Sequence, residues 1–240
     1  MLYQLRDRGA LPQGLDTTVA SILPGYVAPV SPYRSTRGLT LRALATHSSG
    51  LVREVPEPCG ASESCTEAEI LTAVGNSTVL FEQFARTAYS NLGLAMLGRA
   101  LEKVSGVTWE TWVQREILAP LGMERSGTNY TAGVRSFIVD GVDPVDGARA
   151  ALPSPGHTSW AAPCGAMYST SDDMAHWMAF LMGDHPSGDA VLDSATLLEM
   201  HSTTQMQRDG LSGIGGATFE QLRIGTRWAS TKLGCQDGRV

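Results

Sequence analysis

Lysine is almost missing from this sequence, since only Lys103 and Lys232 occur among 240 residues. The formal net charge is -6 at pH 7, and no basic stripe with interleaved aromatics occurs that would neutralise phosphates. We therefore expect no nucleic-acid partner. Long apolar runs are missing too, because no stretch approaches the roughly 20 consecutive apolar residues of a membrane-spanning helix. The first residues also lack a signal-peptide pattern, so the sequence predicts no membrane segment in this chain.

The sequence has no internal repeat and no low-complexity tract that would divide it. With 240 residues, of which 42% are hydrophobic, one folded body would bury roughly 70 to 75% of its unfolded surface. We predict a single domain over residues 1–240.

Clusters of metal ligands are absent from the sequence. The five histidines are scattered, without His-Glu-x-x-His spacing, and of the four cysteines only Cys59 and Cys65 lie close together. That pair is a poor zinc signature, because structural zinc needs four ligands and no histidine lies near it in sequence. We predict a local disulfide between Cys59 and Cys65, no metal site and no cofactor.

Asparagine is rare, and two of the three asparagines, Asn76 and Asn129, begin Asn-x-Ser/Thr glycosylation sequons. Ser and Thr are common enough here that chance remains an alternative explanation for these two sequons. Together with the predicted disulfide, they favour N-glycosylation and an extracellular or extracytoplasmic location.

Start and stop signals of helices dominate the chain. Thr66 and Glu69 form a capping box that predicts a helix to Val74. Apolar residues at helical spacing predict a helix over 91–104 that ends before Gly106. Further helices are predicted over residues 1–8, 108–118, 171–181 and 193–201.

Strand signals are weak by comparison. Residues 137–139 form one short candidate, and residues 219–228 offer one or two more. The Gly- and Pro-rich stretch 141–155 is predicted to be a loop. The expected fold is mostly helical α+β with an under-supplied sheet.

Two common nucleophile motifs are absent. No Gly-x-Ser-x-Gly occurs, which excludes the nucleophile elbow of α/β-hydrolases. No Ser-x-x-Lys occurs either, because the residues three places before the two lysines are Ala100 and Ala229.

Two other pairs are interpreted structurally. His47 and Ser48 are adjacent, and neighbouring side chains of an extended segment point to opposite faces, so they do not form a base and nucleophile. Asp172 and Asp173 are better explained as acids at a helix N-terminus than as a paired general acid and base.

One constellation stands out: Tyr89-Ser90-Asn91 at the start of a predicted helix. It resembles the second motif of the serine β-lactamase and penicillin-binding-protein superfamily, in its class C and esterase-like branch. Three further segments fall in the family's order. Residues 9–24 resemble the turn after the nucleophile helix, residues 44–51 its leucine, histidine and Ser-Gly-Leu element, and residues 163–174 its Gly-Gly-x-x-Ser-Thr-x-x-Asp element, with Cys164 replacing the first glycine.

The resemblance implies a β-lactamase/transpeptidase-like α+β fold, represented here by its helical region and an incomplete antiparallel sheet. It implies hydrolysis of an amide or ester through an acyl-enzyme, with a small-molecule or peptide substrate. By position, Tyr89 would take the proton of the nucleophile and pass it to the leaving group, and Asn91 would orient the substrate amide.

The chain departs from the family at both ends. The expected place of the nucleophile is upstream of Met1, and the third motif has only a weak candidate in Lys232 and Gly234, which lacks the family's threonine. We therefore expect a domain that lacks its nucleophile segment and C-terminal strands, and that has no turnover by itself. Three alternatives stay open: a non-catalytic binding or regulatory protein, an unstable fragment, or Asn91 acting only as a helix cap and Tyr89 only as a packed aromatic.

Overall fold

The computed structural model describes residues 1–33, 38–59, 65–139, 141–142, 147–148, 159–206, 212–215, 220–224 and 227–231. Most of the predicted loop at 141–155, and both third-motif candidates, Lys232 and Gly234, lie outside these residues.

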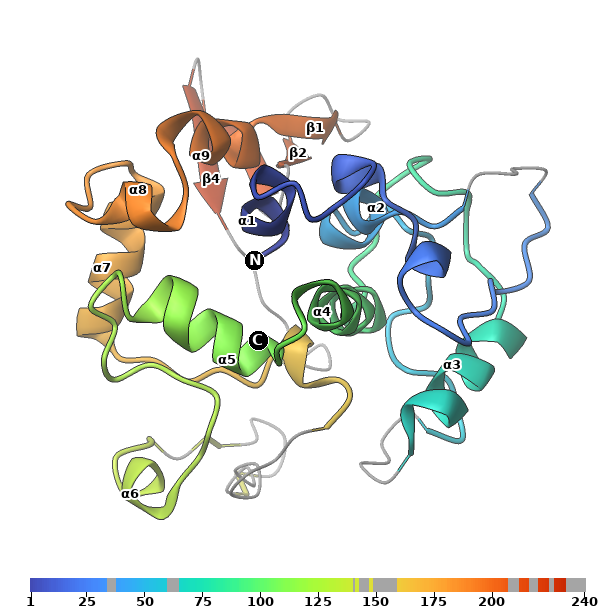
Figure 1. Ribbon diagram of the computed structural model, residues 1–240, viewed down its shortest axis with the longest axis horizontal. Helices are drawn as coiled ribbons and strands as arrows, with labels where there is room; N and C mark the ends of the chain where they lie inside the picture. The colour runs from blue at the N-terminus through green and yellow to red at the C-terminus, as the bar shows by residue number, and fades with distance from the viewer. Residues whose placement is uncertain are drawn as a thin grey trace.

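Helices are the main regular structure of the described chain (Figure 1). They are α1 (Leu2–Asp7), α2 (Leu41–Ala45), α3 (Glu67–Asn76), α4 (Asn91–Ser105), α5 (Trp109–Val113), α6 (Ala132–Arg135), α7 (Ser171–Leu181), α8 (Gly188–Val191) and α9 (Ser194–His201). Shorter helical turns are η1 (Gly14–Asp16), η2 (Val19–Ser21), η3 (Gln114–Leu118), which continues α5 with π-helical geometry, and η4 (Ala162–Cys164).

The predicted helix boundaries follow the local capping chemistry closely. Thr66 and Glu69 form the expected capping box of α3, which runs two residues beyond the predicted end. Helix α4 ends before Gly106, whose φ of 73° is the left-handed geometry that favours glycine. At α7 the cap is Thr170, which accepts a hydrogen bond from the Asp173 amide, so the cap lies one residue before the expected one.

The strands form one antiparallel meander in the order β1-β2-β3-β4. They are β1 (Thr203–Met206), β2 (Ser212–Gly215), β3 (Glu220–Ile224) and β4 (Arg227–Thr231). The prediction of strands within 219–228 is confirmed by β3 and β4. Strands β1 and β2 were not predicted, because their short, Gly- and Thr-containing sequences lack a clear alternating pattern.

The predicted strand at 137–139 is wrong. Phe137 lies in a turn after α6, where its amide donates to the Val134 carbonyl. The side chains of Phe137 and Val139 are 88% and 87% exposed, so these apolar residues are not part of a buried strand. A short apolar triplet is not sufficient to make a strand without a partner strand beside it.

The core is built around α4, which packs against α1, α2, α5 and η4 (Figure 1). Leu92 and Met96 of α4, and Leu41 and Leu44 of α2, are fully buried in one continuous apolar cluster. Buried Leu, Met and Val side chains supply most of the favourable free energy of folding, at about 25 cal/mol per Å² of apolar area. This packing fixes the N-terminal end of α4, where the family-like motif lies.

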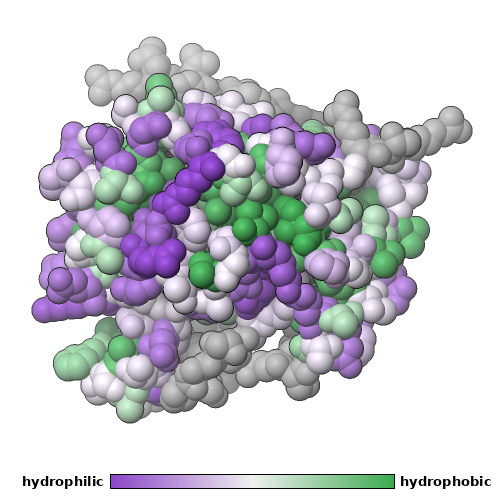
Figure 2. Space-filling model, viewed as in Figure 1, coloured by the Kyte–Doolittle hydropathy of each residue, from purple (hydrophilic) through white to green (hydrophobic). Residues whose placement is uncertain are grey.

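Apolar side chains also reach the surface near the middle of the face seen in Figure 2. A cavity of about 210 Å³ lies between α1, α4, α7 and α9, with Leu97, Trp177 and Phe180 among its lining residues. None of the helices in the described ranges is long and apolar enough to cross a membrane.

Candidate functional site

The site is organised by Ser90, which begins α4. Its hydroxyl accepts a hydrogen bond from the Gly93 amide at 2.9 Å and donates one to the Val52 carbonyl at 2.8 Å. The side chain is completely buried. Ser90, and not Asn91, is therefore the N-cap of α4, which corrects the alternative interpretation of Asn91 as the cap.

Asn91 is the first helical residue, and its side chain makes a different contact. Its Nδ2 donates to Glu54 Oε1 at 2.7 Å. Because a side-chain amide carries two N–H groups and a carbonyl oxygen, this bond uses only one of its donors. Asn91 thus retains both donor and acceptor capacity at the start of α4.

Residues 47–53 form the frame under this motif. The Gly50 carbonyl accepts from the Leu80 amide, the Ser48 carbonyl from the Phe84 amide and the Arg53 carbonyl from the Leu92 amide, at 2.8, 2.8 and 3.1 Å. The frame needs glycine at one position: Gly50 has a φ of 77°, and a Cβ there would lie 2.0 Å from the Phe81 carbonyl oxygen. The glycine of the Ser-Gly-Leu element is therefore required for steric reasons.

His47 is the residue of this frame that contacts Tyr89. It is only 3% exposed, and its ring centroid lies 4.4 Å from that of Tyr89. The adjacent Ser48 hydroxyl is buried and lies 2.7 Å from Thr46 Oγ1. Sequence reasoning rejected His47 and Ser48 as a catalytic pair but missed the contact of His47 with Tyr89, for which the sequence gives no local signal.

Charged side chains surround the motif on its half-exposed side. The Arg53 guanidinium carbon lies 5.1 Å from the centre of the Tyr89 ring. Its Nε lies 3.2 Å from Glu54 Oε1, the oxygen that also accepts from Asn91. A positive charge at this distance from an aromatic ring face is attracted to it. Arg53, Glu54 and Asn91 thus form a polar chain beside Tyr89.

A second resembling element, residues 163–174, packs against α4 through η4 and continues into the start of α7. Gly98 of α4 makes this possible, because a Cβ there would lie 2.3 Å from Pro163 Cβ. The next residue, Cys164, carries a free thiol. Burial raises the pKa of this thiol, and the negative charge of Glu54 raises it further.

The acidic residues of this element have separate structural roles. Asp173 is buried, and its Oδ2 accepts from the Arg125 amide at 2.8 Å and from the Ser126 hydroxyl at 2.7 Å. Asp172 is exposed and lies 3.9 Å from the Arg125 guanidinium. Asp173 therefore has a structural role, which is to hold Arg125 and Ser126 in place, and it does not form a carboxylate pair with Asp172.

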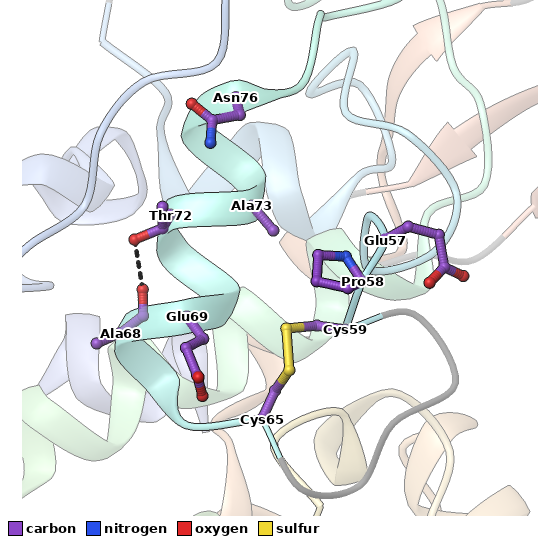
Figure 3. Close-up of a pocket in the computed structure, with 9 residues that line it drawn as sticks. All are labelled: Glu57, Pro58, Cys59, Cys65, Ala68, Glu69, Thr72, Ala73 and Asn76. Carbon is purple, nitrogen blue, oxygen red and sulfur yellow. Dashed lines mark hydrogen bonds between the residues drawn. A yellow bond between two sulfur atoms is a disulfide. The ribbon is translucent and has the colours of Figure 1, made fainter.

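The remaining predicted sites are the cysteine pair and the two sequon asparagines. Cys59 and Cys65 form the predicted disulfide, beside a cavity of about 380 Å³ that Asn76 also lines (Figure 3). Asn76 and Asn129 are both exposed. Within the described ranges, no group of three or more His, Cys, Asp or Glu side chains is arranged to hold a metal ion.

Comparison with known proteins gives a family model and relatives that agree with one another. The family model described as Beta-lactamase matches residues 1–235. Beta-lactamase-like protein 2 of Dictyostelium discoideum is 31% identical over 243 residues, covering 99% of this chain and 43% of that protein. The D-alanyl-D-alanine-carboxypeptidase/endopeptidase AmpH of Escherichia coli strain K12 is 31% identical over 188 residues, covering 74% of this chain and 44% of AmpH. The chain thus spans less than half the length of these relatives.

Solved structures show the same fold at lower identity. A class C beta-lactamase superposes with a TM-score of 0.76 at 18% identity, covering 94% of this chain and 57% of that one. The beta-lactamase/D-alanine carboxypeptidase from Yersinia pestis, complexed with citrate, gives a TM-score of 0.71 at 21% identity, covering 98% of this chain and 67% of that one. The fold is therefore β-lactamase/transpeptidase-like, and α+β as predicted.

Proposed function

The chain belongs to the beta-lactamase family, and from this premise we propose that it carries the proton-transfer and amide-binding residues of a serine hydrolase site. The reaction would be hydrolysis of an amide or ester in a small molecule or peptide, through an acyl-enzyme. The observation that carries the proposal is the placement of Tyr89 and Asn91 on either side of a buried helix cap, Ser90.

Tyr89 is proposed to move the proton. A serine hydroxyl attacks poorly until a neighbouring base takes its proton, and a phenolate can act as that base. The Arg53 guanidinium, whose carbon lies 5.1 Å from the ring centre and whose Nε is paired with Glu54, places a positive charge beside this ring. After acylation begins, the same phenol would return the proton to the leaving group.

Asn91 is proposed to hold the substrate amide. Its second N–H would donate to the substrate carbonyl while Glu54 holds the first, at 2.7 Å, and fixes the orientation of the side chain. Asn91 would then contribute to substrate binding in the ground state as well as in the transition state. Its loss should therefore raise KM and leave kcat nearly unchanged.

We propose no turnover for these 240 residues alone, because no Ser-x-x-Lys occurs in them. The direct test treats the chain with a fluorescent penicillin and reads the intact mass. The expected result is no adduct, and a stoichiometric covalent adduct would overturn the proposal of inactivity.

The family role of Tyr89 is tested in any longer form of the protein that supplies Ser-x-x-Lys. There, Tyr89→Phe should lower kcat by about 10²- to 10⁴-fold, the usual contribution of a general acid–base group. Tyr130→Phe is the matched control, because Tyr130 contacts Tyr168 and not the motif. Equal activity of the Tyr89→Phe variant and the control would contradict the proton-transfer role.

A second function, non-catalytic binding, is favoured by one observation: the motif is ordered by its own frame although the chain has no Ser-x-x-Lys. A recognition site needs only that order. Titration of the chain with a D-alanyl-D-alanine dipeptide, followed by NMR, should then shift the Asn91 side-chain amide, and Asn91→Ala should abolish binding. No shift at millimolar dipeptide would contradict this second function for that ligand.

We also propose that the protein is an extracytoplasmic glycoprotein. The Cys59–Cys65 disulfide and the exposure of Asn76 and Asn129 support this. Expression in a secretory eukaryotic host should give a mass that falls after peptide N-glycosidase treatment. The Asn76→Gln and Asn129→Gln variants would each remove one glycan, and an unchanged mass for the untreated and treated protein would contradict the proposal.

A further inference from the structure

We propose that His47 is a positioning residue, which holds the Tyr89 phenol ring at the start of α4. The meaning of this placement for catalysis rests on the proposed function of Tyr89. The placement itself is measured without turnover.

His47 contacts three successive residues: Ala88, which precedes the motif, and Tyr89 and Ser90 within it. Its carbonyl oxygen accepts from the Ala88 amide at 2.8 Å. Its ring lies 4.4 Å from the Tyr89 ring, centre to centre, with an angle of 33° between the planes. Its Nδ1 accepts from the buried Ser90 amide at 3.1 Å. One residue thus fixes the backbone on both sides of Tyr89 and provides a surface for its ring.

The hydrogen bond to Ser90 defines the state of the imidazole. An Nδ1 that accepts an amide proton carries a lone pair, so the neutral ring has its proton on Nε2. Protonation of Nδ1 would break this bond, because two donors would then face each other. His47 therefore positions the motif as a neutral ring.

The backbone of His47 shows that the side chain, and not the turn, is the reason for histidine here. Helix α2 ends in a Schellman motif, in which the His47 amide donates to the Leu44 carbonyl and the Ser48 amide to the Ala43 carbonyl. His47 occupies the left-handed position of that motif, with a φ of 53°, where glycine is the usual residue. Glycine would make the same turn without strain, so the imidazole supplies something that the turn does not need.

The variants separate these contributions. His47→Gly keeps the left-handed turn and removes both the acceptor and the ring. His47→Asn also tolerates a positive φ, and its Oδ1 stands where Nδ1 stood, so it retains the acceptor for Ser90 without the ring. His176→Asn, an exposed change on α7, is the matched control.

The experiment uses the 240-residue chain with ring-labelled tyrosine and NMR. Six tyrosines occur, and Tyr89→Phe assigns the resonance of Tyr89. In His47→Gly the Tyr89 resonance should move to its solvent-exposed position while the other five stay in place, and added imidazole should restore it. In His47→Asn the Tyr89 resonance should move in the same way, but the Ser90 amide should keep its slow exchange. In His47→Gly that exchange should accelerate about tenfold.

Several outcomes would overturn the proposal. An unchanged Tyr89 resonance in a folded His47→Gly variant would show that the ring needs no support from His47. Loss of cooperative unfolding in both variants would assign His47 to the fold and not to the motif. A ¹⁵N spectrum with the proton on Nδ1 of His47 would contradict the geometry directly. Failure of the proposed function is separate, since it would appear in acylation assays and leave the Tyr89 resonances unaffected.

Discussion

Gln4 and His47 are both buried polar side chains that connect distant segments, and they do so in opposite ways. Gln4 lies in regular helix α1, and its amide donates to the Glu116 and Val191 carbonyls at 3.0 and 3.1 Å and accepts from the Trp112 indole at 2.7 Å. His47 adopts a left-handed backbone, and its carbonyl, ring and Nδ1 contact three consecutive residues, Ala88, Tyr89 and Ser90. The buried polar side chain of Gln4 thus holds several distant segments of the fold together, whereas that of His47 positions the residues around Tyr89.

The largest expected effect tests how tightly the frame around His47 is built. Gly50→Ala places a Cβ 2.0 Å from the Phe81 carbonyl oxygen at a φ of 77°. We expect a loss of about 4 kcal/mol in the free energy of unfolding, since steric overlap adds to backbone strain. Urea unfolding measures it. Gly9→Ala, at a φ of 72° with nothing within 4 Å, isolates the backbone part and should cost about 1 kcal/mol. Equal losses of unfolding free energy in the two variants would show that the frame shifts to accommodate the Cβ at residue 50.

The second-largest effect is expected from removing the buried hydrogen bonds of Gln4. Gln4→Leu preserves the approximate size of the side chain but leaves the Trp112 indole and two carbonyls without their partner. The expected loss is about 3 kcal/mol, because unsatisfied buried polar groups are costly. Urea unfolding with the exposed Gln13→Leu change as the control measures it. The Tyr89 resonance should not move in the Gln4→Leu variant. A shift as large as that of His47→Gly would show that Gln4 also positions the Tyr89 ring.

The third effect tests the cap between the two motif residues. Ser90→Ala removes the bonds to the Gly93 amide and the Val52 carbonyl. The expected loss is about 1 to 2 kcal/mol, as for other N-caps. Ser90→Thr, which keeps the hydroxyl, should recover part of it. A loss below about 0.5 kcal/mol for Ser90→Ala would show that Asn91 caps α4 in its place.

The smallest effect lies in the ion pair between η1 and α2, the helix that precedes the frame, and it depends on pH. The hydrogen bond from Arg42, on α2, lowers the pKa of Asp16 below its ordinary value of 3.8. A carboxyl whose pKa is lower in the folded state stabilises the protein above its unfolded pKa, and this contribution disappears as the pH falls through the folded pKa. Because both side chains are partly exposed, we expect less than about 1 kcal/mol. Asp16→Asn should reduce the stability difference between pH 6 and pH 2.5, and an unchanged difference would contradict the role of this pair.

Much of the fold could be predicted because its signals are local. The capping box at Thr66 and the glycine after α4 act through residues three or four positions away, so the sequence displays them directly. Local signals also leave a one-residue ambiguity, because Ser90 and Asn91 are both good caps. The Val52 carbonyl, from another segment, accepts from the Ser90 hydroxyl and so favours Ser90. The strands β1 and β2 depend on partners more than on their own residues, and the sequence missed them.

The residues of the motif could be predicted from the sequence, but the residues that surround them could not. Tyr89 and Asn91 could be named through the family resemblance, but their surroundings come from residues 47–54, about 40 positions earlier. His47 was placed in a family-like element and rejected as a base for Ser48, but its contact with the Ser90 amide could not be predicted, since it spans 43 positions and follows no periodicity. Contacts of this kind depend on how α2 and α4 pack, which a sequence pattern does not encode.

The close approach of Pro163 to Gly98 makes Cys164 a native chemical reporter. Burial and Glu54, a partner of Asn91, raise the pKa of its thiol, so thiolate-directed alkylation at neutral pH should be slow. Any ligand or substitution that draws Glu54 away or loosens the turn would change that rate. The protein thus contains its own sensor of events beside the motif, readable by mass spectrometry without an added label.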